Sequence, residues 1–376
     1  MEKDLVLAIL NKVQGISDLD WGEIAEFYNL NMHPDTLRKA AVGVKMVADA
    51  GLLNTAEKTY ANEYVAKKQF YDQRREFNNI LTREAREEHL ASCLTSAAEK
   101  LNERYPLLRK DVPSVHGDTE AVLVLSDWHY GMVADNIWNK YNTDICRNRV
   151  AELLTKVRER LALHRVSVLH VIVLGDMANG AIHVTSRVAS EERVADQLMQ
   201  VSELLAQVVS ELANYVDYTQ VYCTYGNHMR TMQNKKESIH MDNMERIIPW
   251  WMAERFKNRE DVVVCDTGKD EMIRAVVCGA EVCAVHGDLD GGREAVLALS
   301  QMYERAFGQK MRYLFTGHIH SVLDTENYGI MSVRTGGLCG ADEFAKNARL
   351  FSNPMQTLAV FDHGEMDALY HIRLGA

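Results

Sequence analysis

Five short runs of apolar, mostly β-branched residues each end in side chains that can bind a metal cation, and this recurrence constrains the fold more than any other feature. Such runs, alternating with helical stretches such as residues 188–213, predict buried strands in an α/β domain. In sheets of this kind, ligands gather at the carboxyl ends of the strands. The five runs end in Ser126-Asp127-Trp128-His129, Gly175-Asp176, Gly226-Asn227-His228, His286-Gly287-Asp288 and Gly317-His318-Ile319-His320.

The strand-like pattern occupies residues 113–376, which we therefore interpret as one α/β domain. It contains nine such runs in all. The other four runs do not end in the predicted metal ligands, and we expect them to be further strands of the sheets. These four runs are residues 261–266, 329–337, 356–362 and 368–374.

Residues 1–55 show helical rather than strand-like periodicity, with apolar residues recurring every three or four positions. A turn-like stretch precedes Asp35, which we expect to cap a third helix ending at Gly51. Short helix, turn and helix together outline a helix-turn-helix-like unit. The region is slightly acidic, so DNA recognition and docking of a protein are equally consistent with it.

Residues 56–112 are rich in interleaved Lys, Arg and Glu and contain no Gly up to about residue 105. This composition predicts a charged linker helix or a coiled-coil arm. It could connect the two flanking regions, reach toward a substrate, or form a homodimer. The α/β domain is a second candidate surface for a homodimer.

Overall composition excludes some function classes. A net charge of −11 over 376 residues gives no global attraction to nucleic acid or to an anionic membrane, so such a partner has to meet a local basic patch. Seven scattered cysteines indicate reduced thiols. The N-terminus lacks a signal-peptide pattern, and no uncharged apolar stretch approaches the roughly 18 residues of a membrane span. We expect a cytoplasmic protein without membrane contact.

The residue types at the strand ends indicate a particular class of metal. Imidazoles, carboxylates and one amide oxygen form a mixed nitrogen and oxygen set that suits Mn, Fe, Zn or Co. A single His in an apolar strand is more often a core residue, but an ordered series of five such ends rarely arises by chance. The candidate ligands are Asp127, His129, Asp176, Asn227, His286, His318 and His320.

This ordered series resembles the signature of the calcineurin-like metallophosphoesterases: Asp-x-His, Gly-Asp, Gly-Asn-His, His and Gly-His-x-His. The resemblance covers roughly residues 120–340 and implies that family's fold, a two-sheet αββα sandwich. It also implies two metal sites that share Asp176 as a bridging ligand. One site would take Asp127, His129, Asp176 and His320, and the other Asp176, Asn227, His286 and His318.

The chemistry expected of such a pair is phosphoester hydrolysis. Two cations about 3.5–4 Å apart lower the pKa of a shared water and aim the resulting bridging hydroxide at phosphorus. The resemblance places His228 beside the substrate phosphate, where it would contact the phosphate or protonate the leaving oxygen. We expect two divalent transition-metal ions, Mn before Fe, Zn or Co.

The sequence departs from the family pattern at one position. The residue directly after Gly-Asn-His is usually acidic and is thought to orient the histidine, but here it is Met229. Asp288 is a candidate to replace that acid. The predicted metal ligands are all present, so the departure does not indicate an inactive protein.

The substrate is less constrained, because this fold serves protein phosphatases, nucleotide phosphodiesterases and nucleases alike. The helix-turn-helix-like leader, cations such as Arg230 near the motifs, and a general similarity to SbcD-type repair exonucleases and phage-borne phosphoesterases favour a nuclease acting on DNA. Arg230 and His183 are candidate substrate contacts. A small-molecule or protein phosphomonoesterase is the main alternative, and a DNA-binding or scaffold protein is another.

Overall fold

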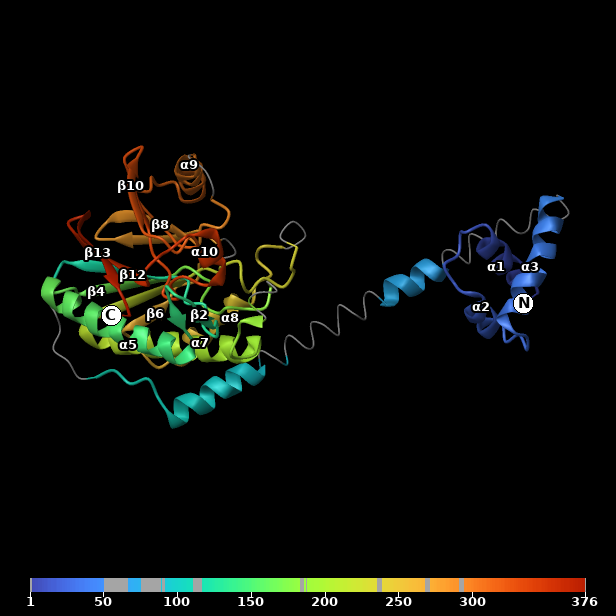
Figure 1. The fold of residues 1–376 in the computed structure, drawn as a ribbon, viewed down its shortest axis with the longest axis horizontal. Coiled ribbons are helices and arrows are strands. Elements are labelled where there is room, and N and C mark those ends of the chain that lie inside the picture. Colours follow the sequence, from blue (N-terminus) through green and yellow to red (C-terminus); the bar gives the residue numbers. More distant parts are fainter. Residues whose placement is uncertain are drawn as a thin grey trace. The chain divides into compact units, whose positions relative to one another are not determined.

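In the computed structural model the chain forms two compact units, Met1–Ser92 and Cys93–Ala376. Figure 1 shows the elements of both units. No helix in the described part of the chain combines the length and apolarity needed to cross a bilayer. The structure describes residues 2–50, 67–75, 89, 92–110, 117–182, 186, 188–234, 239–267, 271–290 and 294–375.

The N-terminal unit contains the predicted helical region. Helices α1 (Glu2–Val13), α2 (Trp21–Phe27) and α3 (Pro34–Asp49) pack around one small core. That core contains Ala8, Ile9, Ile24, Ala25, Leu37 and Ala41.

The start of α3 differs from the expectation. The helix begins at Pro34, and the Nδ1 atom of His33 accepts a hydrogen bond from the Asp35 amide at 3.3 Å. Proline favours the first position of a helix because its φ is already helical and it has no N–H to leave unpaired. The prediction of Asp35 as the cap was therefore wrong, and His33 has that place.

The described parts of the predicted linker are helical at residues 67–75 and 92–104. The second of these segments contacts helix α8 (Ile247–Phe256), because the Asn102 amide donates to the Glu254 carbonyl at 2.9 Å. Residues 105–110 are described and are not helical, and apart from residue 89 the other residues of the predicted linker lie outside the described residues.

A six-stranded mixed sheet carries three of the five predicted ligand ends. Its order is β13-β12-β1-β4-β5-β6, with β1, β4, β5 and β6 parallel and β12 antiparallel to β1. The strands are β1 (Glu120–Leu125), β4 (Val168–Val173), β5 (Tyr218–Cys223), β6 (Val262–Val264), β12 (Met355–Asp362) and β13 (Glu365–Arg373).

A five-stranded sheet carries the other two ends. Its order is β10-β11-β9-β8-β7, and β8 and β9 run parallel. Strands β7 and β10 are additions to the nine predicted runs; β10 is a polar, largely exposed edge strand without the apolar pattern used to find the others. The strands are β7 (Ile273–Val277), β8 (Ala280–Val285), β9 (Tyr313–Thr316), β10 (Leu323–Asn327) and β11 (Ile330–Arg334).

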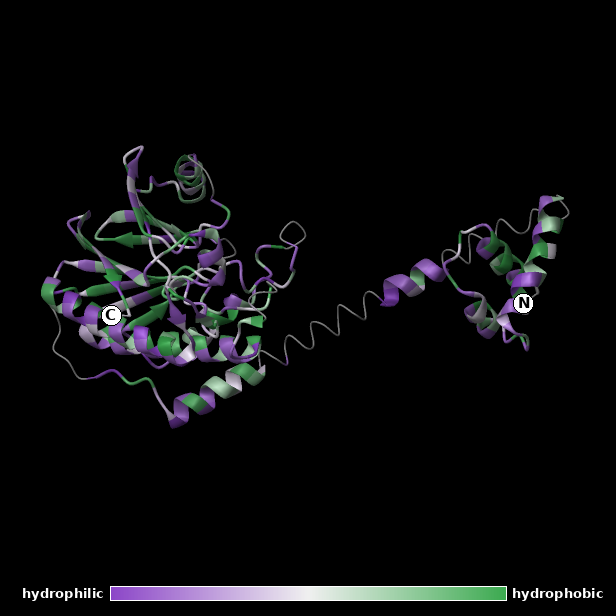
Figure 2. Ribbon diagram, in the orientation of Figure 1, coloured by the Kyte–Doolittle hydropathy of each residue, from purple (hydrophilic) through white to green (hydrophobic). Residues whose placement is uncertain are grey.

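Helices cover the outer faces of the two sheets, and the sheets pack on each other through a shared core. The outer face of the six-stranded sheet packs against α5 (Thr143–His164), α7 (Val194–Leu212) and α8, and that of the five-stranded sheet packs against α9 (Ala295–Phe307). The strands between these helices are largely hydrophobic in Figure 2. The predicted α/β class with a second sheet is confirmed.

Short elements complete the second unit and lie in the connections between strands. They are β2 (Ala134–Asp135), β3 (Lys140–Tyr141), the 3-10 helices η1 (Ala213–Tyr215) and η2 (Met244–Arg246), and α10 (Glu343–Ala348).

Candidate metal centre and its cleft

Strand direction brings the predicted ligands together. Parallel strands have their carboxyl ends at one edge, so the loops after β1, β4 and β5 meet at one edge of the six-stranded sheet, and those after β8 and β9 meet at one edge of the other sheet. The amide of Gly317, after β9, donates to the carbonyl of His286, after β8, at 2.9 Å. The amide of His318 reaches across to the Asp127 carboxylate at 2.9 Å, so the two edges face each other.

The backbone at most of these side chains is left-handed. This conformation costs an L-residue about 1–2 kcal/mol, and it turns the chain sharply off each strand so that the side chain faces the space between the sheets. Cross-loop hydrogen bonds hold it, including the one from the His129 amide to the Asp176 carbonyl at 3.0 Å. The residues are Asp127 (φ 55°), His129 (46°), Asp176 (51°), His318 (65°) and His320 (59°).

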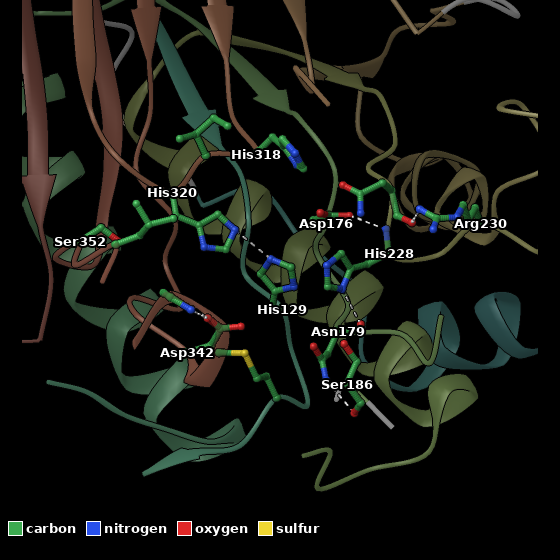
Figure 3. A pocket seen from close by; sticks show the side chains of 15 residues that line it. His129, Asp176, Asn179, Ser186, His228, Arg230, His318, His320, Asp342 and Ser352 are labelled. Carbon is green, nitrogen blue, oxygen red and sulfur yellow. Dashed lines mark hydrogen bonds between the residues drawn. The ribbon is translucent and has the colours of Figure 1, made fainter. Parts of the chain in front are cut away.

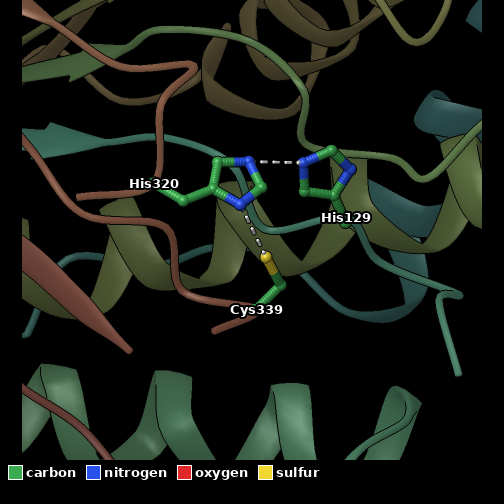
Figure 4. Close-up of side chains that lie close together, drawn as sticks. All are labelled: His129, His320 and Cys339. Atoms are coloured by element: carbon green, nitrogen blue, oxygen red, sulfur yellow. Dashed lines mark hydrogen bonds between the residues drawn. The ribbon is translucent and has the colours of Figure 1, made fainter. Parts of the chain in front are cut away.

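One group of ligand atoms forms around the Asp127 carboxylate. The Nε2 atoms of His129 and His320 lie 3.1 Å apart (Figure 4). The Oδ1 atom of Asp127 lies 3.3 Å from Nε2 of His320 and 3.8 Å from Nε2 of His129. Three ligand-type atoms therefore converge on one point from two different sheets.

A second group forms around Asp176. Its Oδ2 atom lies 3.2 Å from Nε2 of His286, and ligand atoms of Asp176, His286 and His318 all lie within 4.8 Å of one another. Asp176 also lies within that distance of His129 and His228. The Asp176 carboxylate therefore stands between the two groups and contacts both.

Three buried atoms in these groups test whether the residues fit cations. Asp127 Oδ1, Asn227 Oδ1 and His286 Nε2 are buried without a hydrogen-bond partner. Leaving a buried polar atom unpaired is costly, and divalent transition metals accept this combination of carboxylate, amide and imidazole ligands. The seven predicted residues therefore fit a pair of such ions.

Electrostatics keep both carboxylates ionised. Burial alone would raise their pKa values, but the imidazoles of His320 and His286 outweigh it at Asp127, and those of His228 and His286 do so at Asp176, so each pKa lies below its usual range. Burial lowers the pKa of His129, which is therefore neutral. Despite burial, the Asp176 carboxylate raises the pKa of His286 to about 10, and the pKa of His320 lies well above its ordinary value. Metals bind neutral imidazoles, so metal binding would displace a proton from each of these two rings.

Two of the histidine ligand rings, those of His286 and His320, are held from behind at their Nδ1 atoms. His286 Nδ1 is 2.8 Å from the Leu174 carbonyl, and His320 Nδ1 is 3.7 Å from the buried Cys339 sulfur (Figure 4). An Nδ1–H held in this way leaves Nε2 as the ligand atom and fixes the ring's orientation. Cys339 thus lies on the far side of His320 from the converging Nε2 atoms and acts as its support.

An open cleft of about 490 Å³ lies over these groups. Figure 3 shows His129, Asp176, His228, His318 and His320 converging on it. Both polar and apolar side chains line the cleft. The lining includes Asn179, Ser186 and Arg230, and also Met132, Ile319 and Leu350.

A backbone carbonyl orients His228 in place of the usual acid. The Nδ1 atom of His228 lies 2.8 Å from the Asn179 carbonyl, which leaves the opposite ring edge toward the cleft (Figure 3). Met229 is fully buried in the core, where a carboxylate would lack partners. The Oδ1 atom of Asp288 lies 3.7 Å from Nε2 of His240, and the suggestion that Asp288 orients His228 stays a prediction.

The two candidate substrate contacts have different outcomes. Arg230 lines the cleft, but its guanidinium donates to the carbonyls of Asn227, Met232 and Gln233, so it also braces its own loop. His183 lies outside the described residues.

A family model described as calcineurin-like phosphoesterase matches residues 121–322, more than half of the chain. The chain belongs to the calcineurin-like phosphoesterase family. The resemblance read from the strand ends is confirmed, and the protein is a metal-dependent phosphoric ester hydrolase. Assignment to the SbcD-type branch stays a prediction.

Individual relatives are distant. The chain is 22% identical over 291 residues to the SPbeta prophage-derived protein YonJ of Bacillus subtilis (strain 168), a match that covers 74% of this chain and 70% of that protein. It is also similar to a solved archaeal phosphodiesterase (15% identity, TM-score 0.36, 68% of this chain and 99% of that one). Zinc-complexed Vps29 of Entamoeba histolytica is comparable (15%, TM-score 0.31, 68% and 98%).

Sequence reasoning missed Glu245, in η2. This side chain is 1% exposed and accepts hydrogen bonds from backbone amides of the loops that carry Asp176 and Asn227. Burial and the neighbouring Asp176 carboxylate raise the pKa of Glu245 to about 7, a value that bound cations would lower. No spacing pattern marks it, because it contacts these family motifs only through the tertiary fold.

Proposed function

We propose that this phosphoesterase is a phosphodiesterase that cleaves nucleic acid, DNA in particular, with two divalent transition-metal ions, Mn²⁺ by preference. The observation that carries the proposal is the Asp176 carboxylate, which two groups of metal-ligand atoms share at the floor of one open cleft. A shared carboxylate is the usual means of holding two cations close enough to act on one phosphoryl group.

When bound, the cations would supply Lewis-acid activation of water and neutralise charge on the phosphoryl oxygens. They would be held by Asp127, His129, Asp176 and His320 on one side and by Asp176, Asn227, His286 and His318 on the other.

His228 has the role of moving a proton. Its Nδ1–H is directed to the Asn179 carbonyl, so Nε2 is the atom that exchanges a proton or a hydrogen bond with the substrate. The His129 ring packs against it edge-on with centroids 4.5 Å apart, which fixes the His228 ring at the cleft floor. An imidazole in this place suits protonation of the leaving oxygen.

The size of the cleft supports a diester substrate. Its volume of about 490 Å³ is in the range of about 300–1,000 Å³ that encloses a whole organic ligand rather than a phosphate alone. The lining extends from Arg230 on one side of the ligand groups to Ser352 on the other (Figure 3). A phosphodiester has substituents on both sides of phosphorus, and this lining offers surface for each.

Cations on α3 support nucleic acid as the substrate. Arg38, Lys39 and Lys45 are all exposed, and the helix has no acidic residue between Asp35 and Asp49. Within residues 1–55, six of the eight acidic residues lie on α1, on α2 or in the connection between them, so α3 carries three cations and two acids although this region is slightly acidic. Such a face can contact phosphates without reading bases.

The test is a side-by-side assay of the Mn²⁺-loaded full-length protein on single-stranded DNA, duplex DNA, a cyclic nucleotide, a phosphopeptide and bis(p-nitrophenyl) phosphate. We expect hydrolysis of the diesters, with DNA preferred, and loss of all hydrolysis in Asp176→Asn. Turnover of the phosphopeptide alone would replace the proposal with a phosphomonoesterase. Absence of any turnover with Mn²⁺, Fe²⁺, Zn²⁺ or Co²⁺ would refute it.

A further inference from the structure

The Glu245 carboxylate makes four hydrogen bonds, and all of them go to backbone amides. Oε2 accepts from the amides of Asp176 at 3.0 Å and Gly226 at 2.8 Å. Oε1 accepts from those of Met177 at 2.6 Å and Ala178 at 3.3 Å. An ionised carboxylate offers about four lone-pair sites and no donor, so this set of four N–H groups uses its accepting capacity in full.

The four amides belong to two loops that lie against each other. One follows β4 and carries Asp176, and the other follows β5 and carries Asn227. The fit leaves no spare room: a Cβ atom on Gly175 would lie 2.1 Å from the Gly226 nitrogen, and one on Gly226 would lie 2.1 Å from Oδ1 of Asp176. Because one oxygen, Oε2, binds an amide from each loop, Glu245 fixes the distance between them.

Glu245 is itself held from behind by Asn243. The Asn243 side chain accepts from the Glu245 amide at 3.0 Å and donates to the Gly226 carbonyl at 2.7 Å. The next residue, Met244, donates its amide to the carbonyl of Met229 at 2.9 Å. The segment around η2 is therefore joined to the Asn227 loop at three points.

We infer that Glu245 is a positioning residue of the metal centre, which holds the Asp176 and Asn227 loops in register so that Asp176 contacts both groups of ligands. This inference rests on the proposed function. The Glu245 carboxylate reaches the two ligand loops from a segment about sixteen residues further along the chain than Met229. The residue touches neither substrate nor cation and acts through the backbone of the ligands.

Glu245→Gln is the informative variant. Glutamine has the same shape but only one accepting oxygen, and its NH₂ group would face two backbone N–H groups. The loops would separate or turn, and a ligand must stay within about 0.2 Å of its place to bind a metal well. We expect Mn²⁺ affinity to fall by about 10- to 100-fold, the usual effect of removing a residue that supports metal ligands.

The measurement is a titration of full-length protein with Mn²⁺ alone, in which electron paramagnetic resonance reports the free ion and thermal unfolding is followed in parallel. The matched control is Glu203→Gln. The Glu203 carboxylate accepts three hydrogen bonds from Trp251 and Arg255, outside the cleft. This control should lower the melting temperature and leave Mn²⁺ affinity unchanged.

Each outcome decides something. If Glu245→Gln lowers the melting temperature but binds Mn²⁺ like the wild type, Glu245 is structural only and the inference is wrong. Should that variant fail to fold, Asn243→Ala removes the support behind Glu245, and unchanged Mn²⁺ affinity in it overturns the inference equally. Wild-type protein that binds no Mn²⁺ would refute the proposed function, and the inference with it.

Discussion

Alanine in place of Gly226 should inactivate the protein, because its Cβ atom would displace the Asp176 carboxylate. The added Cβ atom would lie 2.1 Å from Oδ1 of Asp176, whereas real Cβ atoms essentially never approach closer than 3.0 Å, so the carboxylate has to retreat by about 0.9 Å. The same oxygen accepts the His228 amide at 2.8 Å, and that hydrogen bond would be lost with the movement. One methyl group would therefore disturb Asp176 and His228 together.

The expected effect on activity is large and the effect on stability is moderate. A misplacement of about 1 Å costs roughly 10²-fold in rate, so kcat/KM for Mn²⁺-dependent hydrolysis of bis(p-nitrophenyl) phosphate should fall at least that far. Overpacking typically costs about 1–3 kcal/mol in the free energy of unfolding, which urea denaturation would measure.

Gly279→Ala separates the two effects. Gly279 lies in the β7–β8 hairpin with φ +83° and open space around it, so alanine there costs about 1–2 kcal/mol of backbone strain without touching the cleft. Activity should survive in this control. If Gly226→Ala keeps activity within a few-fold of wild type, the Asp176 loop can adjust without harm, and the reasoning from the tight fit is refuted.

Further predictions concern a metal ligand, the proposed proton donor and the stability of each of the two units. Asp176→Asn should reduce bound Mn²⁺, measured by elemental analysis, and hydrolysis should fall to the level of the metal-free protein; unchanged metal content would contradict the bridging role. His228→Gln should slow hydrolysis of an alkyl diester by about 10²- to 10⁴-fold and of a p-nitrophenyl diester much less, because the latter leaving group needs no proton; equal losses would argue against proton transfer. Burial opposes ionisation of Asp261, but hydrogen bonds from Arg259 hold its pKa below the ordinary value, so its contribution to stability is present above about pH 4 and is lost as the pH falls through the lowered pKa. Asp261→Asn should therefore flatten the fall in melting temperature below that pH. Gly43→Ala, at an open position in α3, should stabilise the N-terminal unit by about 1 kcal/mol in urea denaturation.

The seven candidate ligands were visible in the sequence because each follows a strand. Strand endings have a local signature, an apolar run and then a polar residue, and parallel strands end at a common edge, so a one-dimensional pattern specified a three-dimensional cluster. All nine predicted runs correspond to strands, from β1 at Glu120–Leu125 to β13 at Glu365–Arg373. The polar edge strand β10 was missed because it buries little and carries no such pattern.

The residues that support the ligands had no comparable signature. Glu245 lies in a one-turn 3-10 helix, and Asn179 contributes a backbone carbonyl, which any residue type has. Cys339 reads in the sequence as another core thiol. The role of each depends on which distant loop packs against it, and that is decided by the assembled fold. The acid expected after Gly-Asn-His is absent at a position that the core fills with Met229.

The left-handed backbone at five of the predicted ligands has a consequence for how this sequence would change if catalysis were no longer needed. Holding Asp and His in that conformation costs about 1–2 kcal/mol each, and glycine or asparagine would relieve this cost at the same positions. A descendant released from hydrolysis should therefore drift toward Gly and Asn at 127, 129, 176, 318 and 320 and become more stable as it does so.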